Sequence, residues 1–231
     1  MAPNPSVRFL HESDEYRQAR DELLQAELGL RHQIEEVAAL RRKLPLGGEV
    51  PEDYVFEESS GQGDGVTTVR LSQLFAPDKD SLILYSYMFS PKMEKPCASC
   101  TSILDGLDGE APHVRQRANF AVVAKSPVAR IREVGRQRGW RNLRLLSSAN
   151  NTFNRDYHAE DAKGDQMPLL NVFVRRGGKT YHSYTSEMLW SPNEPGQDGR
   201  HVDMVWPLWH LLDLTPEGRG ATHHPKLAYD K

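Results

Sequence analysis

The sequence predicts an α/β fold built on one mixed central sheet, with a long helix before it. Apolar runs typical of buried strands occur at residues 81–89, 119–125 and 143–147, and helical segments separate them. Strands that alternate with helices pair in parallel through right-handed crossovers. A hairpin pattern at residues 167–184 adds antiparallel strands, so we expect the sheet to be mixed.

The first expected element is a helix over residues 13–44. Apolar or small residues alternate by three and four along it, and charged residues occupy the remaining faces. Pro45 and two glycines behind it end the helix. Two roles stay open, a helix that lies on its own domain and an arm through which two copies form a homodimer. We expect residues 1–48 to form this arm and residues 49–231 to form the main α/β domain.

The main domain is expected to begin with a β-hairpin. Two stretches rich in β-branched and aromatic residues flank the turn sequence SSGQGDG. After the strand at 81–89, residues 101–109 suit a helix of two or three turns, and residues 111–117 suit a second short one. Ser126 and Pro127 then provide the N-cap and first position of an amphipathic helix that ends at a glycine.

The last third of the chain mixes a polar segment, a hairpin and a short helix. Within the irregular segment 148–166, residues 148–158 either line a substrate pocket with Asn154 and His158 or form a solvated loop. The hairpin turns at a Gly-Gly pair. A final helix is expected over residues 202–212, where Pro207 would kink or shorten it. Three tryptophans either cover a cleft or belong to a core or interface: Trp190, Trp206 and Trp209.

Composition and charge argue against several classes of protein. The 231 residues are 38% hydrophobic and 26% charged, which is ordinary for a globular protein. The net charge of −3 gives no support to nucleic-acid binding. The longest apolar runs are too short to cross a bilayer, and the charged N-terminus lacks the apolar core of a secretory signal. We therefore expect a cytoplasmic protein with neither nucleic-acid nor membrane partners.

Both cysteines of the chain, Cys97 and Cys100, lie in the segment KPCASC, shortly after the strand at 81–89. Cytoplasmic thiols are kept reduced, so such a pair is more often catalytic or metal-binding than a structural disulfide. The pair opens a helix at the carboxyl end of a strand, where chemistry collects in open α/β sheets. The helix N-terminus and the ammonium group of Lys95 would stabilise a thiolate. Cys97 is then expected to attack a disulfide and Cys100 to resolve it.

Two other interpretations of the cysteine pair stay open, a metal site and a chemically idle pair. One C-x-x-C supplies two of the four ligands of zinc, so histidines would have to supply the rest. None of the nine histidines shows an H-x₃₋₅-H spacing. We therefore expect no metal and no other cofactor.

The run from SLILYSYMF through CASCTSILDGLDG to FNRDYH resembles an uncharacterised bacterial family of thioredoxin-like proteins, described as predicted dithiol-disulfide oxidoreductases. The segments RRKLP, EDYVFE and LLDLTPEGRG fit the same family, so the resemblance covers nearly the whole chain. It implies a thioredoxin fold with a peroxiredoxin-like N-terminal hairpin. It also implies a thiol–disulfide oxidoreductase that acts on a protein or small-molecule disulfide or thiol, and it names no substrate.

The same resemblance assigns candidate site residues. Cys97 and Cys100 match the C-x-x-C of thioredoxin-like enzymes. Met167 and Pro168 match the substrate-binding position where such proteins place a cis-proline that faces the disulfide. The alternative for Pro168 is an ordinary trans proline at the start of a strand.

Two departures from the family patterns matter. Ala98 and Ser99 stand where thioredoxin has Gly-Pro, and the strand before the cysteines carries no buried aspartate, for which Glu94 is a weak substitute. Glu94 also stands where the peroxiredoxin pattern P-x-x-x-T-x-x-C needs a threonine. This departure argues against a thiol-dependent peroxidase on the same cysteines, which is kept as the first alternative function. A non-catalytic or metal-binding protein on a thioredoxin fold is the second.

Overall fold

The computed structural model describes residues 8–60, 65–187, 192–196, 205–220 and 222–229. By internal contacts the chain divides into two compact units, Met1–Pro45 and Leu46–Lys231.

The first unit is built on one long helix, α1 (Asp14–Arg42), as the sequence predicts. Its N-cap is Ser13, whose Oγ accepts the backbone N–H of Tyr16 at 3.1 Å. Acidic residues fill the first turn and basic residues the last, which opposes the helix macrodipole at both ends. None of the 29 residues of α1 is buried.

We expect α1 to form a homodimer through its apolar stripe, which includes Leu23, Leu30 and Val37. Deletion of residues 1–44 should then change the mass measured by light scattering from that of a dimer to that of a monomer. Because the deletion removes the whole apolar stripe through which two copies would bury area from water, the change should be complete. An intact chain that is already monomeric at micromolar concentration contradicts the prediction.

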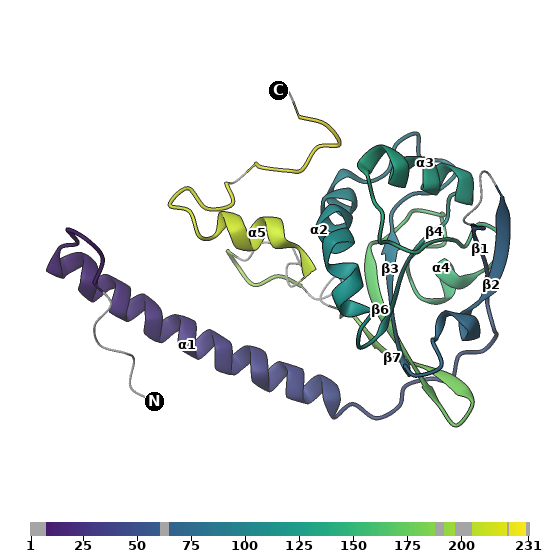
Figure 1. Cartoon of the computed structure of the whole chain (residues 1–231), viewed down its shortest axis with the longest axis horizontal. Coiled ribbons are helices and arrows are strands. Elements are labelled where there is room, and N and C mark those ends of the chain that lie inside the picture. Colours follow the sequence, from purple (N-terminus) through teal and green to yellow (C-terminus); the bar gives the residue numbers. More distant parts are fainter. Residues whose placement is uncertain (1–7, 61–64, 188–191, 197–204, 221, 230–231) are drawn as a thin grey trace. The chain divides into compact units, whose positions relative to one another are not determined.

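The second unit is built on a seven-stranded sheet with the order β2-β1-β5-β4-β3-β6-β7 (Figure 1). The pairs β3–β4 and β4–β5 are parallel, and all other neighbours are antiparallel. The predicted mixed sheet and both predicted hairpins are thus confirmed. The strands are β1 (Val55–Ser59), β2 (Val66–Arg70), β3 (Ser81–Tyr87), β4 (Asn119–Ala124), β5 (Leu145–Ser147), β6 (Leu169–Arg176) and β7 (Lys179–Thr185).

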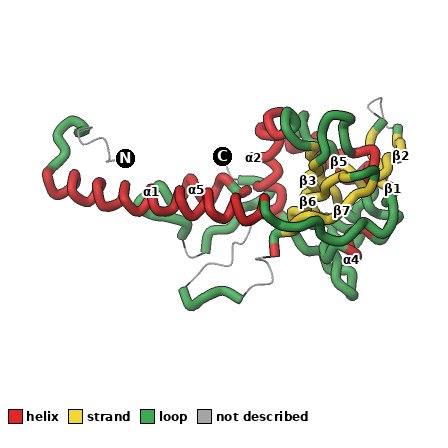
Figure 2. Tube along the Cα trace, turned by 90° about the horizontal axis from the view of Figure 1, so that it is seen from below, coloured by secondary structure: helices red, strands yellow, loops and turns green. Residues whose placement is uncertain are grey.

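Helices cover both faces of the sheet and make two apolar cores. On one face, α2 (Ala98–Val114), α3 (Val128–Arg138) and α5 (Pro207–Leu212) pack on side chains of β3 and β4. On the other face, the 3₁₀-helix η1 (Leu71–Leu74) and α4 (Phe153–Asp156) pack on the same strands. Figure 2 shows the strands between α2 and α4. Two parallel strands joined by a helix, followed by an antiparallel hairpin and a helix, make the predicted thioredoxin-like α/β fold.

Helix α2 differs from the two short helices expected there. It runs without a break from Ala98 to Val114 and contains Pro112. Proline removes one backbone donor and breaks a helix in its interior. Pro112 lies two residues before the end of α2, so the hydrogen bond that it cannot donate is lost from the last turn only.

Two other helix starts also differ from the expectation. Ser126 does not cap α3, because its Oγ accepts a hydrogen bond from Arg130 and its N–H donates to Phe89. The N-cap is Pro127. Pro207 begins α5 instead of kinking it, since the first helical position needs no N–H. Residues 202–204 of the expected final helix lie outside the described residues.

Buried hydrogen bonds of Asn154 hold the segment after β5 in place. Asn154 is 1% exposed, and its side chain accepts from the Ser148 hydroxyl at 2.6 Å and donates to Gln166 at 3.1 Å. Asn154 therefore belongs neither to a solvated loop nor to the lining of a pocket. Its polar neighbours in the sequence suggested exposure, whereas its amide is buried and hydrogen-bonded to other side chains. His158 lines a cavity of about 440 Å³ together with His182.

Trp206 and Trp209 belong to the core beneath α2. They are 5% and 1% exposed, and the indole N–H of Trp206 donates to the Ser102 hydroxyl at 3.1 Å. The core interpretation of these two is confirmed, and Trp190 lies outside the described residues. None of the helices in the described part of the chain is long and apolar enough to cross a bilayer.

Candidate active site

The cysteine pair lies on the first turn of α2, directly beyond the carboxyl end of β3. Cys97 is the N-cap residue, with extended backbone angles of φ −60° and ψ 123°, and Cys100 lies one turn along. The backbone N–H of Cys97 donates to the carbonyl of Met88 at 3.1 Å, which fixes the loop to the end of the strand. Both thiols are free, the Cys97 side chain is half-buried, and Cys100 is buried.

The surroundings of Cys97 stabilise its thiolate. The thiol of Cys100 donates a hydrogen bond to Cys97, and this is the main reason why the pKa of Cys97 falls to about 6. The backbone N–H groups of Cys100 and Ser99 lower the pKa further, and the Cys100 N–H lies 3.5 Å from the sulfur. Partial burial acts in the opposite direction and is outweighed.

The surroundings of Cys100 keep its proton in place. Its hydrogen bond to Cys97 and its burial both raise the pKa of Cys100 well above the value of a free thiol. Near neutral pH the pair therefore holds one thiolate at the surface-facing position and one thiol beneath it. Two groups whose environments drive their pKa values apart are typical of a nucleophile and its partner.

Lys95 has a different place from the one expected. The causes that lower the pKa of Cys97 are the Cys100 thiol and two backbone N–H groups, and the Lys95 ammonium is not among them. The side chain of Lys95 instead lines the cavity described below. The expected contribution of the helix N-terminus is present, because both N–H donors belong to the first turn of α2.

Two residues missed by the sequence analysis anchor this turn. The hydroxyl of Thr101 donates to the carbonyl of Cys97 at 2.8 Å, and the hydroxyl of Tyr87 lies 2.7 Å from the same Thr101 oxygen. Since Thr101 gives its proton to the carbonyl, Tyr87 must be the donor to Thr101. Tyr85, fully buried on the same face of β3, packs in the core that also contains Cys100. In the sequence, the alternation of Ile83, Tyr85 and Tyr87 could have indicated that the two tyrosines share one face of the strand before the cysteines.

Arg130 of α3 holds the loop that leads to Cys97. Its guanidinium donates to the carbonyls of Met93 at 2.7 Å and Glu94 at 3.2 Å, and reaches two more carbonyls, those of Ser90 and Pro91, at 3.3 and 3.4 Å. It also stacks over the ring of Phe89, 4.5 Å from the centroid. One planar side chain thus fixes most of the loop between β3 and α2.

Replacing Arg130 with methionine should lower the free energy of unfolding by about 2 to 3 kcal/mol, because hydrogen bonds to a charged donor and a stacked cation are lost together. The midpoint of urea unfolding measures this. Hydrogen exchange should rise at the amides of residues 93–95 and of Cys97. Arg136→Met is the matched control on the same helix, since Arg136 is exposed and pairs only with Glu133 among the described residues, and should change stability by less than about 0.5 kcal/mol. Equal effects of the two changes would contradict the prediction.

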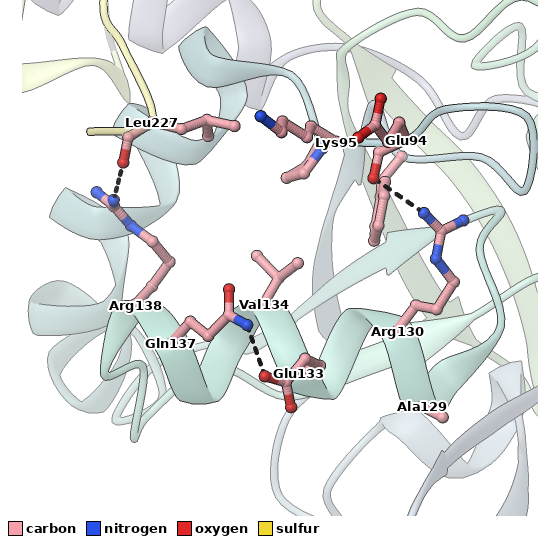
Figure 3. Close-up of a pocket in the computed structure, with 11 residues that line it drawn as sticks. Glu94, Lys95, Ala129, Arg130, Glu133, Val134, Gln137, Arg138 and Leu227 are labelled. Carbon is pink, nitrogen blue, oxygen red and sulfur yellow. Dashed lines mark hydrogen bonds between the residues drawn. The ribbon is translucent and has the colours of Figure 1, made fainter.

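A cavity of about 640 Å³ lies beside this loop. Figure 3 shows Glu94 and Lys95 on one side of it and side chains of α3 on the other. Pro96, the neighbour of Cys97, is part of the wall, and so are Phe89 and Val134.

Met167 and Pro168 lie at the start of β6, near the edge of the sheet where β3 ends. Leu169, the next residue, pairs with Ser86 of β3. No cis peptide bond occurs in the described residues, so the bond before Pro168 is trans and the prediction of a cis bond is wrong. Trans is the ordinary state of such bonds, and the Met167 N–H is held by the carbonyl of Ala159 at 2.9 Å. The expected docking role of both residues depended on the cis geometry, so it has no support from this site.

The full sequence places this site in a family. Residues 6–230 match the family described as "Bacterial protein of unknown function (DUF899)". The chain belongs to the DUF899 family. No curated protein matches this DUF899 chain.

Solved structures resemble the DUF899 chain only distantly. Peroxidoxin BcpB from Mycobacterium tuberculosis is 19% identical with a TM-score of 0.45, and the match covers 71% of this chain and 95% of that one. AhpC from Enterococcus faecalis is 11% identical with a TM-score of 0.46, covering 73% and 94%. Thioredoxin peroxidase I from Plasmodium yoelii is 16% identical with a TM-score of 0.46, covering 81% and 100%. These likenesses assign no activity to the chain.

Within the described ranges, no group of three or more His, Cys, Asp or Glu side chains is placed to hold a metal ion. The cysteine site of this DUF899 protein consists of a thiolate, a protonated thiol and the backbone N–H donors of the first turn of α2.

Proposed function

We propose that the chain is a thiol–disulfide oxidoreductase in which Cys97 is the nucleophile and Cys100 the resolving thiol. The observation that supports it most strongly is the difference in pKa between two thiols that lie one helical turn apart. The half-buried Cys97 has a pKa of about 6, and the buried Cys100 keeps its proton. A nucleophilic thiol is most effective when its pKa lies near the ambient pH.

The reaction has two exchange steps. The Cys97 thiolate attacks one sulfur of a substrate disulfide, forms a mixed disulfide, and releases the other sulfur as a thiolate. Cys100 then loses its proton and attacks the Cys97 sulfur, which forms the Cys97–Cys100 disulfide and releases the second substrate thiolate. The protein gives up two electrons and the substrate takes them up. An external dithiol reductant must return the pair to its reduced state.

A redox titration tests the proposal. The protein is equilibrated with dithiothreitol buffers of known ratio, its thiols are labelled, and the labelled mass is read. A reversible couple of two electrons at Cys97 and Cys100 is expected. Parallel samples with added zinc test whether the cysteines form a metal site instead. Samples in which a hydroperoxide replaces the oxidised buffer test whether the protein is a peroxidase. Stoichiometric zinc that blocks labelling, or faster oxidation by hydroperoxide than by any disulfide, would replace this proposal with one of the alternatives.

A further inference from the structure

We propose that the cavity beside Cys97 is the substrate subsite of the cysteine pair, and that it takes a zwitterionic disulfide derived from an amino acid. The inference rests on the proposed function and names the substrate class of that same site. It depends on where the cavity lies, on which of its charges are already paired, and on which remain for a ligand.

The cavity begins one residue away from the nucleophile. Pro96 forms part of its wall, and consecutive Cα atoms lie about 3.8 Å apart. A group bonded to the Cys97 sulfur therefore has the cavity within reach. At about 640 Å³ the space exceeds the need of one amino-acid residue, so a small disulfide fits together with its water.

Most charged groups around the cavity are occupied by the protein itself. The Arg130 guanidinium binds backbone carbonyls of the loop. Arg138 pairs with Asp105 and donates to the carbonyl of Leu227 at 2.8 Å, and Glu133 accepts from Gln137 at 2.6 Å. These groups shape the wall and leave little charge for a ligand.

Glu94 and Lys95 are the exception. Both are exposed and line the cavity, and neither side chain forms a hydrogen bond or ion pair with a described residue (Figure 3). They are neighbours in the loop directly before Pro96 and Cys97. The Lys95 ammonium also adds little to the thiolate, since the donors that lower the pKa of Cys97 are others.

An adjacent carboxylate and ammonium complement a ligand that carries both charges. A carboxylate on the substrate would pair with Lys95, and an ammonium group would pair with Glu94. Both groups must lie within a few bonds of the reacting sulfur, because the loop lies next to Cys97. Amino-acid-derived thiols have this arrangement. In the exchange, one such disulfide and the protein dithiol give two small thiols and the Cys97–Cys100 disulfide.

Four small disulfides that differ in charge test the inference: cystine, cystamine, 3,3′-dithiodipropionate and 2-hydroxyethyl disulfide. The rate constant for oxidation of the reduced full-length protein is measured with each probe. It is divided by the rate constant of the same probe with dithiothreitol, which removes differences in intrinsic reactivity. We expect the ratio for cystine to exceed that for uncharged 2-hydroxyethyl disulfide at least fivefold.

Two variants assign the charges. Relative to 2-hydroxyethyl disulfide, Lys95→Met should lower the ratios of cystine and dithiodipropionate about fivefold, and Glu94→Gln those of cystine and cystamine. A fivefold change is what an exposed ion pair provides at low salt, and it should shrink in 0.5 M salt. Lys92→Met is the matched control from the same loop, because Lys92 binds the carbonyl of Lys163 and does not line the cavity. It should leave all ratios unchanged.

The outcomes separate the two proposals. If no probe oxidises the wild-type protein, the proposed function fails and this inference fails with it. If 2-hydroxyethyl disulfide is used and cystine is no better, only the inference is overturned. A Lys95→Met variant that slows all four probes by the same factor would also overturn it, since the ammonium would then act on Cys97 and not on the substrate.

Discussion

Replacing Cys97 with serine should abolish disulfide exchange, with a loss of more than about a thousandfold in the rate of reduction of a model disulfide. The thiolate of Cys97 is the only ionised sulfur of the pair near neutral pH, and a serine hydroxyl in its place neither ionises nor attacks sulfur at that pH. The measurement is thiol release from 2-hydroxyethyl disulfide. A Cys97→Ser protein as fast as wild type would show that the assignment of the nucleophile is wrong.

The complementary change separates the two roles. Cys100→Ser removes the resolving sulfur but leaves Cys97 with its two backbone donors, so the mixed disulfide on Cys97 should accumulate. Intact-mass measurement should find one half of the substrate disulfide added to the chain, and a thiol reductant should remove it. Release of the adduct at the wild-type rate would mean that Cys100 does not resolve.

Alkylation of Cys97 by iodoacetamide should rise with pH through a midpoint of about 6, because only the thiolate reacts. At pH 7 about nine-tenths of Cys97 should be ionised. Cys100 should stay unlabelled over the same range, since its pKa is raised and its side chain is buried. Peptide mass spectrometry after a short pulse of reagent distinguishes the two sites. Equal labelling of both thiols at pH 7 would contradict the prediction.

A matched pair of variants identifies the cause of the low pKa. The Cys100 thiol is the largest contributor, so Cys100→Ala should move the midpoint for Cys97 upward by removing a hydrogen-bond donor. Cys100→Ser keeps a hydroxyl donor and should move it less. An identical midpoint in wild type and Cys100→Ala would assign the stabilisation to the helix N-terminus alone.

Much of the fold was predictable because its signals are local. The apolar run of β3, the Gly177-Gly178 turn between β6 and β7, and the long apolar repeat of α1 each specify an element within a few residues. Helix ends were less predictable where two roles compete for one side chain. Ser126 has the chemistry of an N-cap, but Arg130 uses its hydroxyl instead, and only the folded chain brings that guanidinium close.

The candidate site was predictable in part. Two cysteines at this spacing indicate a thiol pair by themselves, but their environment depends on contacts between distant segments. Arg130 of α3 reaches the loop before Cys97 only in the folded chain, so the sequence offered no sign of it. Lys95 is the opposite case, because its place next to the cysteines in the sequence suggested a role at the thiolate that its contacts do not support.

The donors that surround the Cys97 thiolate, the Cys100 thiol first and then the N–H groups of the first turn of α2, link folding to the redox state of the chain. They stabilise a thiolate but give little to a disulfide sulfur, so the reduced chain gains stability that the oxidised chain lacks. Because the pKa of Cys97 is lowered on folding, this gain is fully present above the pKa of the unfolded thiol, at roughly pH 8.5, and is lost as the pH falls through about 6. A disulfide across two intervening residues closes a short loop and restrains the unfolded chain only modestly. In the thermodynamic cycle of folding and oxidation, the Cys97–Cys100 disulfide is thus a stronger oxidant in the folded chain than in the unfolded chain, where these donors are not held around Cys97.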